Sequence, residues 1–252
     1  MITSLSNSQI KNIQTLLKKS KERFSQGLFV AEGVRMTSEA AKLGIIEKVY
    51  MSESFSGKDI FEGIPQEIVT DSVMAAVSDT VTSQGVLALV KIPERNAETL
   101  LEEAKALIML ENLQDPGNLG TIIRTAEAAG MDAVVLSENS VDVYNPKVVR
   151  STMGALFRVP IIYVPGFTAL VKKLGEEGWH TIATHLSGKI DFPEADYSGK
   201  TAILVGNEGN GLTDETTEAA VTKVIIPMEG KVESLNAGIA AALMMYEIKR
   251  NR

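Results

Sequence analysis

The chain has 252 residues and a net charge of −7, and its 44% hydrophobic and 23% charged residues are typical of a soluble globular protein. It has no cysteine, which excludes disulfides, cysteine-ligated zinc and a cysteine nucleophile; its two histidines are too few for a histidine-rich site, so we expect no metal. No stretch has the apolar length of a membrane helix and the N-terminus has no signal-peptide pattern, so we expect no membrane partner.

Residues 1–92 predict a small α/β domain. Apolar residues at helical spacing predict a helix over 7–19, and a second helix is predicted over 34–43. A strand and turn are predicted at 28–33, and further strands at 47–52, 68–69 and 86–90. The polar, proline-containing stretch 91–96 ends this pattern, so we place a linker at 93–105.

Residues 106–252 predict a second domain. Apolar strands are predicted at 107–110, 133–136, 159–164, 180–184, 202–205 and 223–226. Helices are predicted at 118–129, with Asn118 as N-cap, and at 148–156, 167–177, 213–220 and 235–249. Strands that are apolar throughout and alternate with helices are typical of a parallel sheet covered on both faces.

Three loops that follow predicted strands hold the residues suited to chemistry: 111–124, 206–212 and 226–238. Ligands bind outside the carboxyl ends of strands in open α/β sheets, so we expect one site there. The glycines at 206–211 are spaced G-x-x-G-x-G, which is not the Rossmann pattern, and no P-loop pattern occurs. A glycine loop without a lysine fits a nucleoside moiety that carries no phosphates.

In this order the three loops resemble the three motifs of the SpoU (TrmH-type, SPOUT superfamily) RNA ribose 2′-O-methyltransferases. The matching stretches are N-L-x-D-P-x-N-x-G-x-x-x-R at 112–124, G-N-E-G-x-G-L at 206–212 and P-M-x-G-x-x-x-S-L-N-A-G-I-A at 227–240. The N-terminal S-x-x-N-x-x-I-K, K-K-x-K-x-R and F-V-A-E-G-x-R are similar to the RNA substrate-binding domain of rRNA-type members, which resembles small ribosomal-protein-like folds.

The resemblance implies a methyltransferase domain with a deep trefoil knot, S-adenosyl-L-methionine as cofactor, a homodimer and a cytoplasmic location. It implies catalytic roles for Asn118, Arg124, Glu208, Ser234 and Asn236. The cofactor would contact Thr184, Gly206, Asn207, Gly209, Ile226, Met228 and Leu235, and His185 is a further candidate for this site.

Basic residues near the N-terminus are the predicted RNA contacts: Lys11, Lys18, Lys19, Lys21, Arg23 and Arg35. Only Glu22 opposes the first five of them, which gives an acidic protein a local basic region. A solvated helix face has the same pattern, so both interpretations stay open.

Taken singly, these residues also have structural explanations. Asn118, Ser234 and Asn236 suit helix caps, the glycines suit turns, and Glu208 suits a solvated loop. The last helix is more apolar than one core face requires, which fits either a central core helix or a dimer contact.

The predicted function is 2′-O-methylation of a ribose in structured RNA, with large-subunit rRNA as first and tRNA as second substrate. Because a guanidinium resists deprotonation, we expect Arg124 to stabilise the alkoxide while Glu208 or a phosphate takes the proton. The lack of cysteine argues against methylation at pyrimidine C5. Methylation of a base nitrogen and a non-catalytic rRNA-binding or assembly role remain as alternatives.

Overall fold

A computed structural model describes all 252 residues, and the chain forms two compact units. Unit 1 comprises Met1–Glu94 and Asp142–Phe157, and unit 2 comprises Arg95–Val141 and Arg158–Arg252. The first boundary lies within the predicted linker, which also contains a short helix, α5 (Ala97–Glu103). None of the helices combines the length and apolar character needed to cross a membrane.

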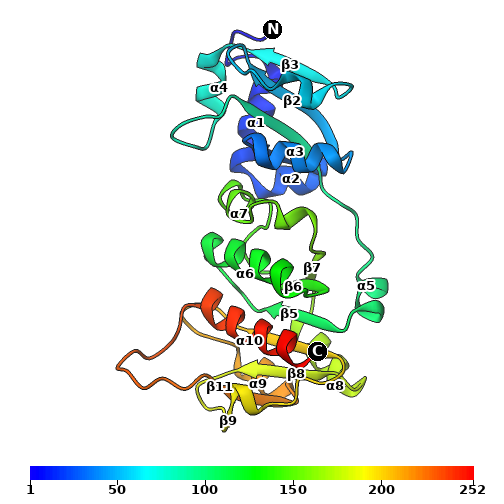
Figure 1. Cartoon of the computed structure of the whole chain (residues 1–252), viewed down its shortest axis with the longest axis vertical. Helices are drawn as coiled ribbons and strands as arrows, with labels where there is room; N and C mark the ends of the chain where they lie inside the picture. The colour runs from blue at the N-terminus through cyan, green and yellow to red at the C-terminus, as the bar shows by residue number, and fades with distance from the viewer. The chain divides into compact units, whose positions relative to one another are not determined.

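Unit 1 is built on a four-stranded sheet of order β1-β4-β2-β3, of which Figure 1 labels β2 and β3. Strand β4 is antiparallel to both of its neighbours, and β2 and β3 are parallel. The strands are β1 (Leu28–Glu32), β2 (Ile46–Ser52), β3 (Gln66–Val69) and β4 (Val86–Lys91). The helices are α1 (Ser8–Lys18), α2 (Ser20–Gln26), α3 (Val34–Lys42), α4 (Asp71–Val77), the short 3-10 helix η1 (Lys58–Phe61) and, from the second segment, α7 (Pro146–Ser151) and the 3-10 helix η2 (Ala155–Phe157).

Helix α1 supplies the clearest link between sequence pattern and core in unit 1. The side chain of Asn7 caps the helix by accepting a hydrogen bond from the Gln9 amide. Ile10, Ile13 and Leu16 lie on one face of the helix and are fully buried in a cluster with residues of β1, β3, β4 and α4. The predicted helix at 7–19 is therefore confirmed, with both ends one residue shorter.

The prediction that Arg23 contacts RNA is wrong, because its side chain is buried. Its guanidinium forms a salt bridge with Asp142, with Nε donating at 2.7 Å, and also donates to the carbonyl of Leu16. Only 4% of the Arg23 side chain is exposed. A count of charges along the chain cannot show this burial, since the partner lies 119 residues away.

The second segment of unit 1, Asp142–Phe157, also adds an aromatic contact to β1. The ring of Tyr144 lies 4.7 Å from that of Phe29, centroid to centroid, and Phe157 stacks on Phe29 at 6.3 Å. The segment deviates from the predicted helix at 148–156. Met153 and Gly154 have positive φ angles of 54° and 94°, which separate α7 from η2.

Unit 2 contains a wholly parallel sheet of seven strands in the order β7-β6-β5-β10-β8-β11-β9. The strands are β5 (Ala106–Leu110), β6 (Ala133–Ser137), β7 (Ile161–Val164), β8 (His180–Thr184), β9 (Ile190–Asp191), β10 (Thr201–Val205) and β11 (Thr222–Ile225). The helices are α5, α6 (Pro116–Ala129), α8 (Phe167–Glu176), α9 (Asp214–Ala219) and α10 (Ala237–Asn251), with the 3-10 helix η3 (Phe192–Glu194). The predicted parallel sheet is confirmed; the short β9 and η3 carried no usable pattern.

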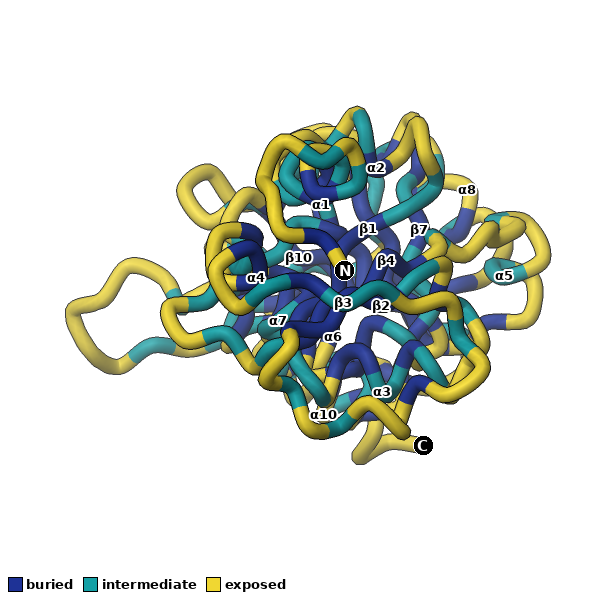
Figure 2. Tube along the Cα trace, turned by 90° about the horizontal axis from the view of Figure 1, so that it is seen from above, coloured by how far each residue is buried: buried dark blue, intermediate teal, exposed yellow.

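Both faces of this sheet are covered, as the apolar strands predicted. Leu107 and Met109 of β5 pack in a cluster with residues of α8 such as Val171. Their neighbours Ile108 and Leu110 are also fully buried, on the opposite face, where α6 and α10 pack against the sheet (Figure 1). Figure 2 accordingly draws the strands largely as buried and the connecting loops largely as exposed.

The Arg23–Asp142 pair generates a stability prediction. Replacing Asp142 by Ala leaves a buried guanidinium without its counter-charge, so we expect the free energy of unfolding in urea to fall by about 3 kcal/mol. Glu177→Ala is the matched control, since it breaks an ion pair whose partners are both more than half exposed, and we expect a change within about 0.5 kcal/mol. Equal effects of the two substitutions would show that the buried pair has no special role.

Candidate functional site

Three loops meet at the carboxyl edge of the sheet in unit 2. They follow Leu110 at the end of β5, Val205 at the end of β10 and Ile225 at the end of β11. The chain runs from β5 outward to β6 and β7, then crosses to β8 on the other side, and β10 inserts between β5 and β8. Such a reversal of strand order opens a crevice, which is where open α/β sheets bind ligands.

A chain of hydrogen bonds joins the three loops through their polar side chains. The Asn118 amide Nδ2 donates to Glu208 Oε1 at 3.0 Å, and Asn236 Nδ2 donates to Asn118 Oδ1 at 2.8 Å. Asn236 is also the N-cap of α10, because its Oδ1 accepts from the amides of Gly238 and Ile239. Asn118, Glu208 and Asn236 are thus brought together as one connected group, which we call the Asn–Glu–Asn chain.

The prediction that Asn118 caps its helix is wrong. Helix α6 begins two residues earlier, at Pro116, and Asp115 is its N-cap, accepting from the Asn118 backbone amide at 2.8 Å. Proline suits the first helical position because its missing N–H would have no partner there. The Asn118 side chain is therefore free to join the loops, and this residue is 9% exposed.

Glu208 holds the loop that precedes α6. Its carboxylate accepts hydrogen bonds from the backbone amides of Gln114 at 3.1 Å and Asp115 at 2.9 Å, besides the one from Asn118. Burial raises the pKa of Glu208, but the hydrogen bonds from Asn118 and from backbone amides outweigh it, so the pKa of this carboxyl lies below its ordinary value. Glu208 is consequently ionised at neutral pH and is a weaker base than an ordinary glutamate.

The glycine loop after β10 folds back tightly on the strand end. Asn207 and Gly211 exchange two backbone hydrogen bonds of 2.9 and 2.8 Å, and Gly211 has a φ of +69°. A Cβ at Gly206 would lie 2.0 Å from the carbonyl carbon of Gly211, so no larger residue fits. Gly206 and Gly211 are therefore required by the turn itself, whereas Gly209 has room for a Cβ.

Asn207 connects this turn to the end of β5. Its Nδ2 donates to the carbonyl of Asn112 at 2.8 Å, while its Oδ1 accepts from the amides of Gly209 and Asn210. Asn112 adopts a φ of +52°, and Ser137 Oγ accepts from its backbone amide at 2.8 Å. A left-handed residue other than glycine, fixed by two loops, indicates a conformation imposed by the site. No periodicity in the sequence pointed to this conformation of Asn112.

A cavity of about 300 Å³ lies at the ends of β8, β10 and β11. All seven predicted cofactor contacts line it, namely Thr184, Gly206, Asn207, Gly209, Ile226, Met228 and Leu235. Glu208 and Ser234 also line it, as does His185, whereas Asn118 and Asn236 do not. Residues that sequence reasoning did not single out are Leu186, Val205, Asn210, Gly211, Ile225, Glu233, Ala237 and Ala240, most of which carry no motif signal.

The lining fits a nucleoside with a positively charged substituent. Its ionisable side chains are Glu208, Glu233 and His185, and it contains neither lysine nor arginine, so phosphate groups find no counter-charge. Glycine backbone offers close polar contacts, and Ile226 and Leu235 offer apolar ones. This donor set and a volume at the small end of ligand pockets suit S-adenosyl-L-methionine, whose sulfonium carries a positive charge.

Arg124 is not joined to the Asn–Glu–Asn chain. It is exposed on α6 and makes no hydrogen bond or ion pair. Six residues separate it from Asn118, so the two side chains point about 120° apart around the helix axis. Arg124 is therefore available to an external partner such as a phosphate.

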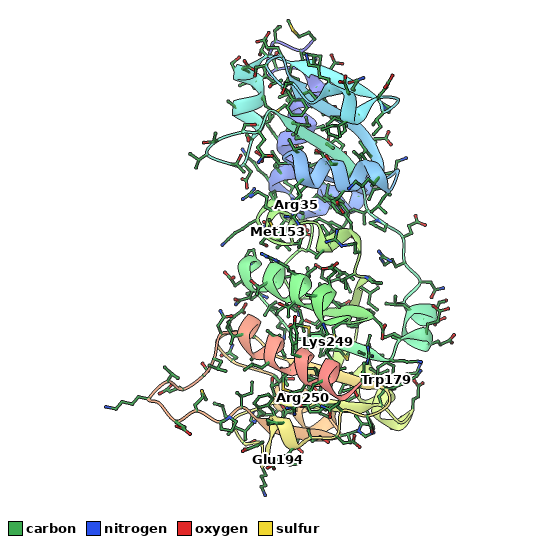
Figure 3. The ribbon with its side chains drawn as sticks, viewed as in Figure 1. Arg35, Met153, Trp179, Glu194, Lys249 and Arg250 are labelled. Carbon is green, nitrogen blue, oxygen red and sulfur yellow. The ribbon has the colours of Figure 1, made fainter.

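The remaining predicted RNA contacts lie in unit 1 and are exposed. Lys11, Lys18, Lys19 and Lys21 on and next to α1 and α2 form no ion pair. Arg35 on α3, which Figure 3 labels, forms none either. No neighbouring carboxylate offsets the charge of these side chains, so they can bind an anionic partner such as a phosphate. The exposure is compatible with both interpretations, an RNA contact and a solvated face.

Comparisons with known proteins identify a family and relatives for both units. Residues 105–246 match the SpoU rRNA Methylase family and residues 7–88 the MRM3-like substrate binding domain. The 23S rRNA (guanosine(2553)-2′-O)-methyltransferase RlmP of Bacillus subtilis is 34% identical over 98% of both chains. An AdoMet-bound rRNA methyltransferase from Sinorhizobium meliloti has a TM-score of 0.88 at 30% identity, covering 99% of this chain and 97% of that one. The SpoU methyltransferase AviRb from Streptomyces viridochromogenes, in complex with AdoMet, has a TM-score of 0.87 at 27% identity, covering 97% and 98%.

The lowered pKa of Glu208 predicts a pH-dependent contribution to stability. Because the pKa of Glu208 is lower in the folded than in the unfolded protein, its ionised carboxylate stabilises the fold at pH values above the unfolded pKa of about 4.3. This stabilisation is lost as the pH falls through the pKa of the folded state. We expect Glu208→Gln to lower the melting temperature at about pH 7 and to lower it much less at about pH 3. Glu138→Gln, at an exposed position with no hydrogen-bond partner, should follow the unaltered protein at both pH values. A pH-independent effect of Glu208→Gln would contradict the assignment.

Proposed function

This chain belongs to the SpoU rRNA methylase family, and we propose that it transfers a methyl group from S-adenosyl-L-methionine to a ribose 2′-hydroxyl of large-subunit rRNA. The observation that carries the proposal is the meeting of the three loops, because the Asn–Glu–Asn chain fixes them around one cavity. The cofactor supplies an electrophilic methyl group when it is bound.

The protein's own residues position the reactants and stabilise the charge that develops in this reaction. The cavity lining would hold the cofactor, so that the attacking hydroxyl needs only to be placed in line with the methyl group, and such positioning contributes up to about 7–11 kcal/mol. Arg124 stabilises the developing alkoxide and the neighbouring phosphate, since a guanidinium stays charged. Glu208 already accepts three hydrogen bonds, so we assign it to holding the loops and assign the proton to a substrate phosphate.

Unit 1 supports rRNA as the substrate. It contains the part that matches a substrate binding domain, and it carries exposed cations without partners in a protein of net charge −7. Structured RNA is recognised through shape, phosphates and 2′-hydroxyls, which suits an enzyme that modifies ribose. Transfer RNA and a base nitrogen are the second-choice targets. The intact set of site residues disfavours a role as a silent assembly factor.

We also propose a cytoplasmic homodimer with a trefoil knot in unit 2. The match of residues 105–246 to the SpoU rRNA Methylase family supports the knot. Helix α10 supports the dimer. Its residues Ile239, Leu243 and Tyr246 are 51%, 38% and 48% exposed and lie on one face, while Met244 and other residues of the opposite face are fully buried.

Mapping of 2′-O-methyl groups by mass spectrometry, in rRNA and tRNA from cells with and without the gene, tests the proposal. We expect one ribose mark in large-subunit rRNA to disappear with the gene. In cells that carry Arg124→Ala instead of the unaltered gene, we expect the mark to form at least about 100-fold more slowly, because an electrostatic contact in the transition state is lost. Lys172→Ala, which removes an exposed cation of α8, should restore the mark fully.

Each contrary result has a distinct meaning. Loss of a base mark would favour methylation at a ring nitrogen, and loss of no mark would favour a non-catalytic RNA-binding role. Full activity of Arg124→Ala would remove this arginine from the mechanism.

The exposed face of α10 generates a prediction about oligomeric state. We expect the protein to have twice its chain mass of 27.2 kDa in sedimentation equilibrium, and Leu243→Glu to make it monomeric by placing a charge in the apolar contact. Val221→Glu is the control, since Val221 is 61% exposed outside α10. A monomeric unaltered protein, or a dimer that tolerates Leu243→Glu, would contradict this interface.

A further inference from the structure

Two carboxylates line the cavity, and they differ in what they bind. Glu208 has three hydrogen-bond donors from the protein, so its charge is used within the fold. Glu233 makes no hydrogen bond and no ion pair, although it lies in the same lining. Its charge is therefore available to whatever occupies the cavity.

Glu233 lies in the long connection between β11 and α10, which projects away from the sheet (orange in Figure 1). Within this connection, Met228, Glu233, Ser234 and Leu235 line the cavity. Glu229, Lys231 and Glu233 are all exposed, and of these three only Glu233 lines the cavity. One carboxylate of the connection thus faces the cavity and another does not. This difference offers a matched pair of positions for a test.

No lysine or arginine in the lining competes for Glu233. In such a cavity an unpaired carboxylate raises the local concentration of cations and repels anions. A ligand with a cationic end satisfies the carboxylate, and a charge-assisted hydrogen bond is roughly twice as strong as a neutral one.

We infer that Glu233 is a further cofactor-binding residue, which binds the positively charged end of S-adenosyl-L-methionine, while the glycine loop binds the adenosine. This inference rests on the proposed function. It makes Glu233 a specificity-determining residue, because ligands with the same adenosine but no positive charge do not use it.

Isothermal titration calorimetry of the full chain with two ligands tests the inference. The ligands are S-adenosyl-L-methionine and 5′-methylthioadenosine, which keeps the adenosine and the sulfur but lacks the charged end. We expect Glu233→Gln to weaken binding of the first about tenfold, which corresponds to about 1.4 kcal/mol, and to change binding of the second less than twofold. Glu229→Gln should change neither by more than twofold. Since Glu233 has no partner within the protein, the melting temperature of the free Glu233→Gln variant should not change.

Two results would overturn the inference while the proposed function stands. Glu233→Gln could weaken the binding of both ligands equally, which would mean that this residue shapes the loop. It could also leave the binding of both ligands unchanged. An equal loss in Glu229→Gln would likewise exclude a specific contact. If the unaltered protein bound no S-adenosyl-L-methionine, the proposed function itself would fail, and the inference about Glu233 with it.

Discussion

The site of this protein depends on one carboxylate that holds two distant loops together. Glu208 and Asn118 are 90 residues apart in the chain, and the amides of Gln114 and Asp115 bind the same carboxylate. Because those amides precede α6, the charge also lies where the helix dipole favours an anion. The loop before α10 then attaches through Asn236, which fixes the start of that helix at the same time. One connected group thus sets the positions of the three loops, the cap of α10 and the shape of the cavity.

Much of the fold could be predicted from the sequence, and the exceptions share a physical cause. The apolar strands of unit 2 and the amphipathic α1 were predictable because the spacing of their apolar residues along the sequence indicates which residues are buried. The short helices α2, α4 and α5 were missed, since seven residues hold too few apolar positions to define a period. The cap of α6 was misplaced because Asp115 and Asn118 are both good caps. Pro116 at the first helical position favours Asp115, and the Asn118 side chain instead contacts Glu208.

The site residues were predictable as a set rather than in their individual roles. Every predicted cofactor position except Thr184 lies in the motif loops, and all seven line the cavity, but the motifs could not show that Asn236 acts both as a cap and as a bridge. The burial of Arg23 could not be predicted from the sequence either, because it depends on Asp142 from a distant part of the chain. Long-range pairing is the information that local patterns lack.

The composition of unit 1 from two separate stretches limits how modular this protein is. The polypeptide crosses between the units at three points, after Glu94, after Val141 and after Phe157, instead of at one linker. A recombination event that exchanged residues 1–94 alone would leave the apolar side of α7 and the rings of Tyr144 and Phe157 without their partner surface. The two units are therefore expected to evolve as a matched pair, with new substrate preferences arising by surface substitution more readily than by shuffling of whole domains.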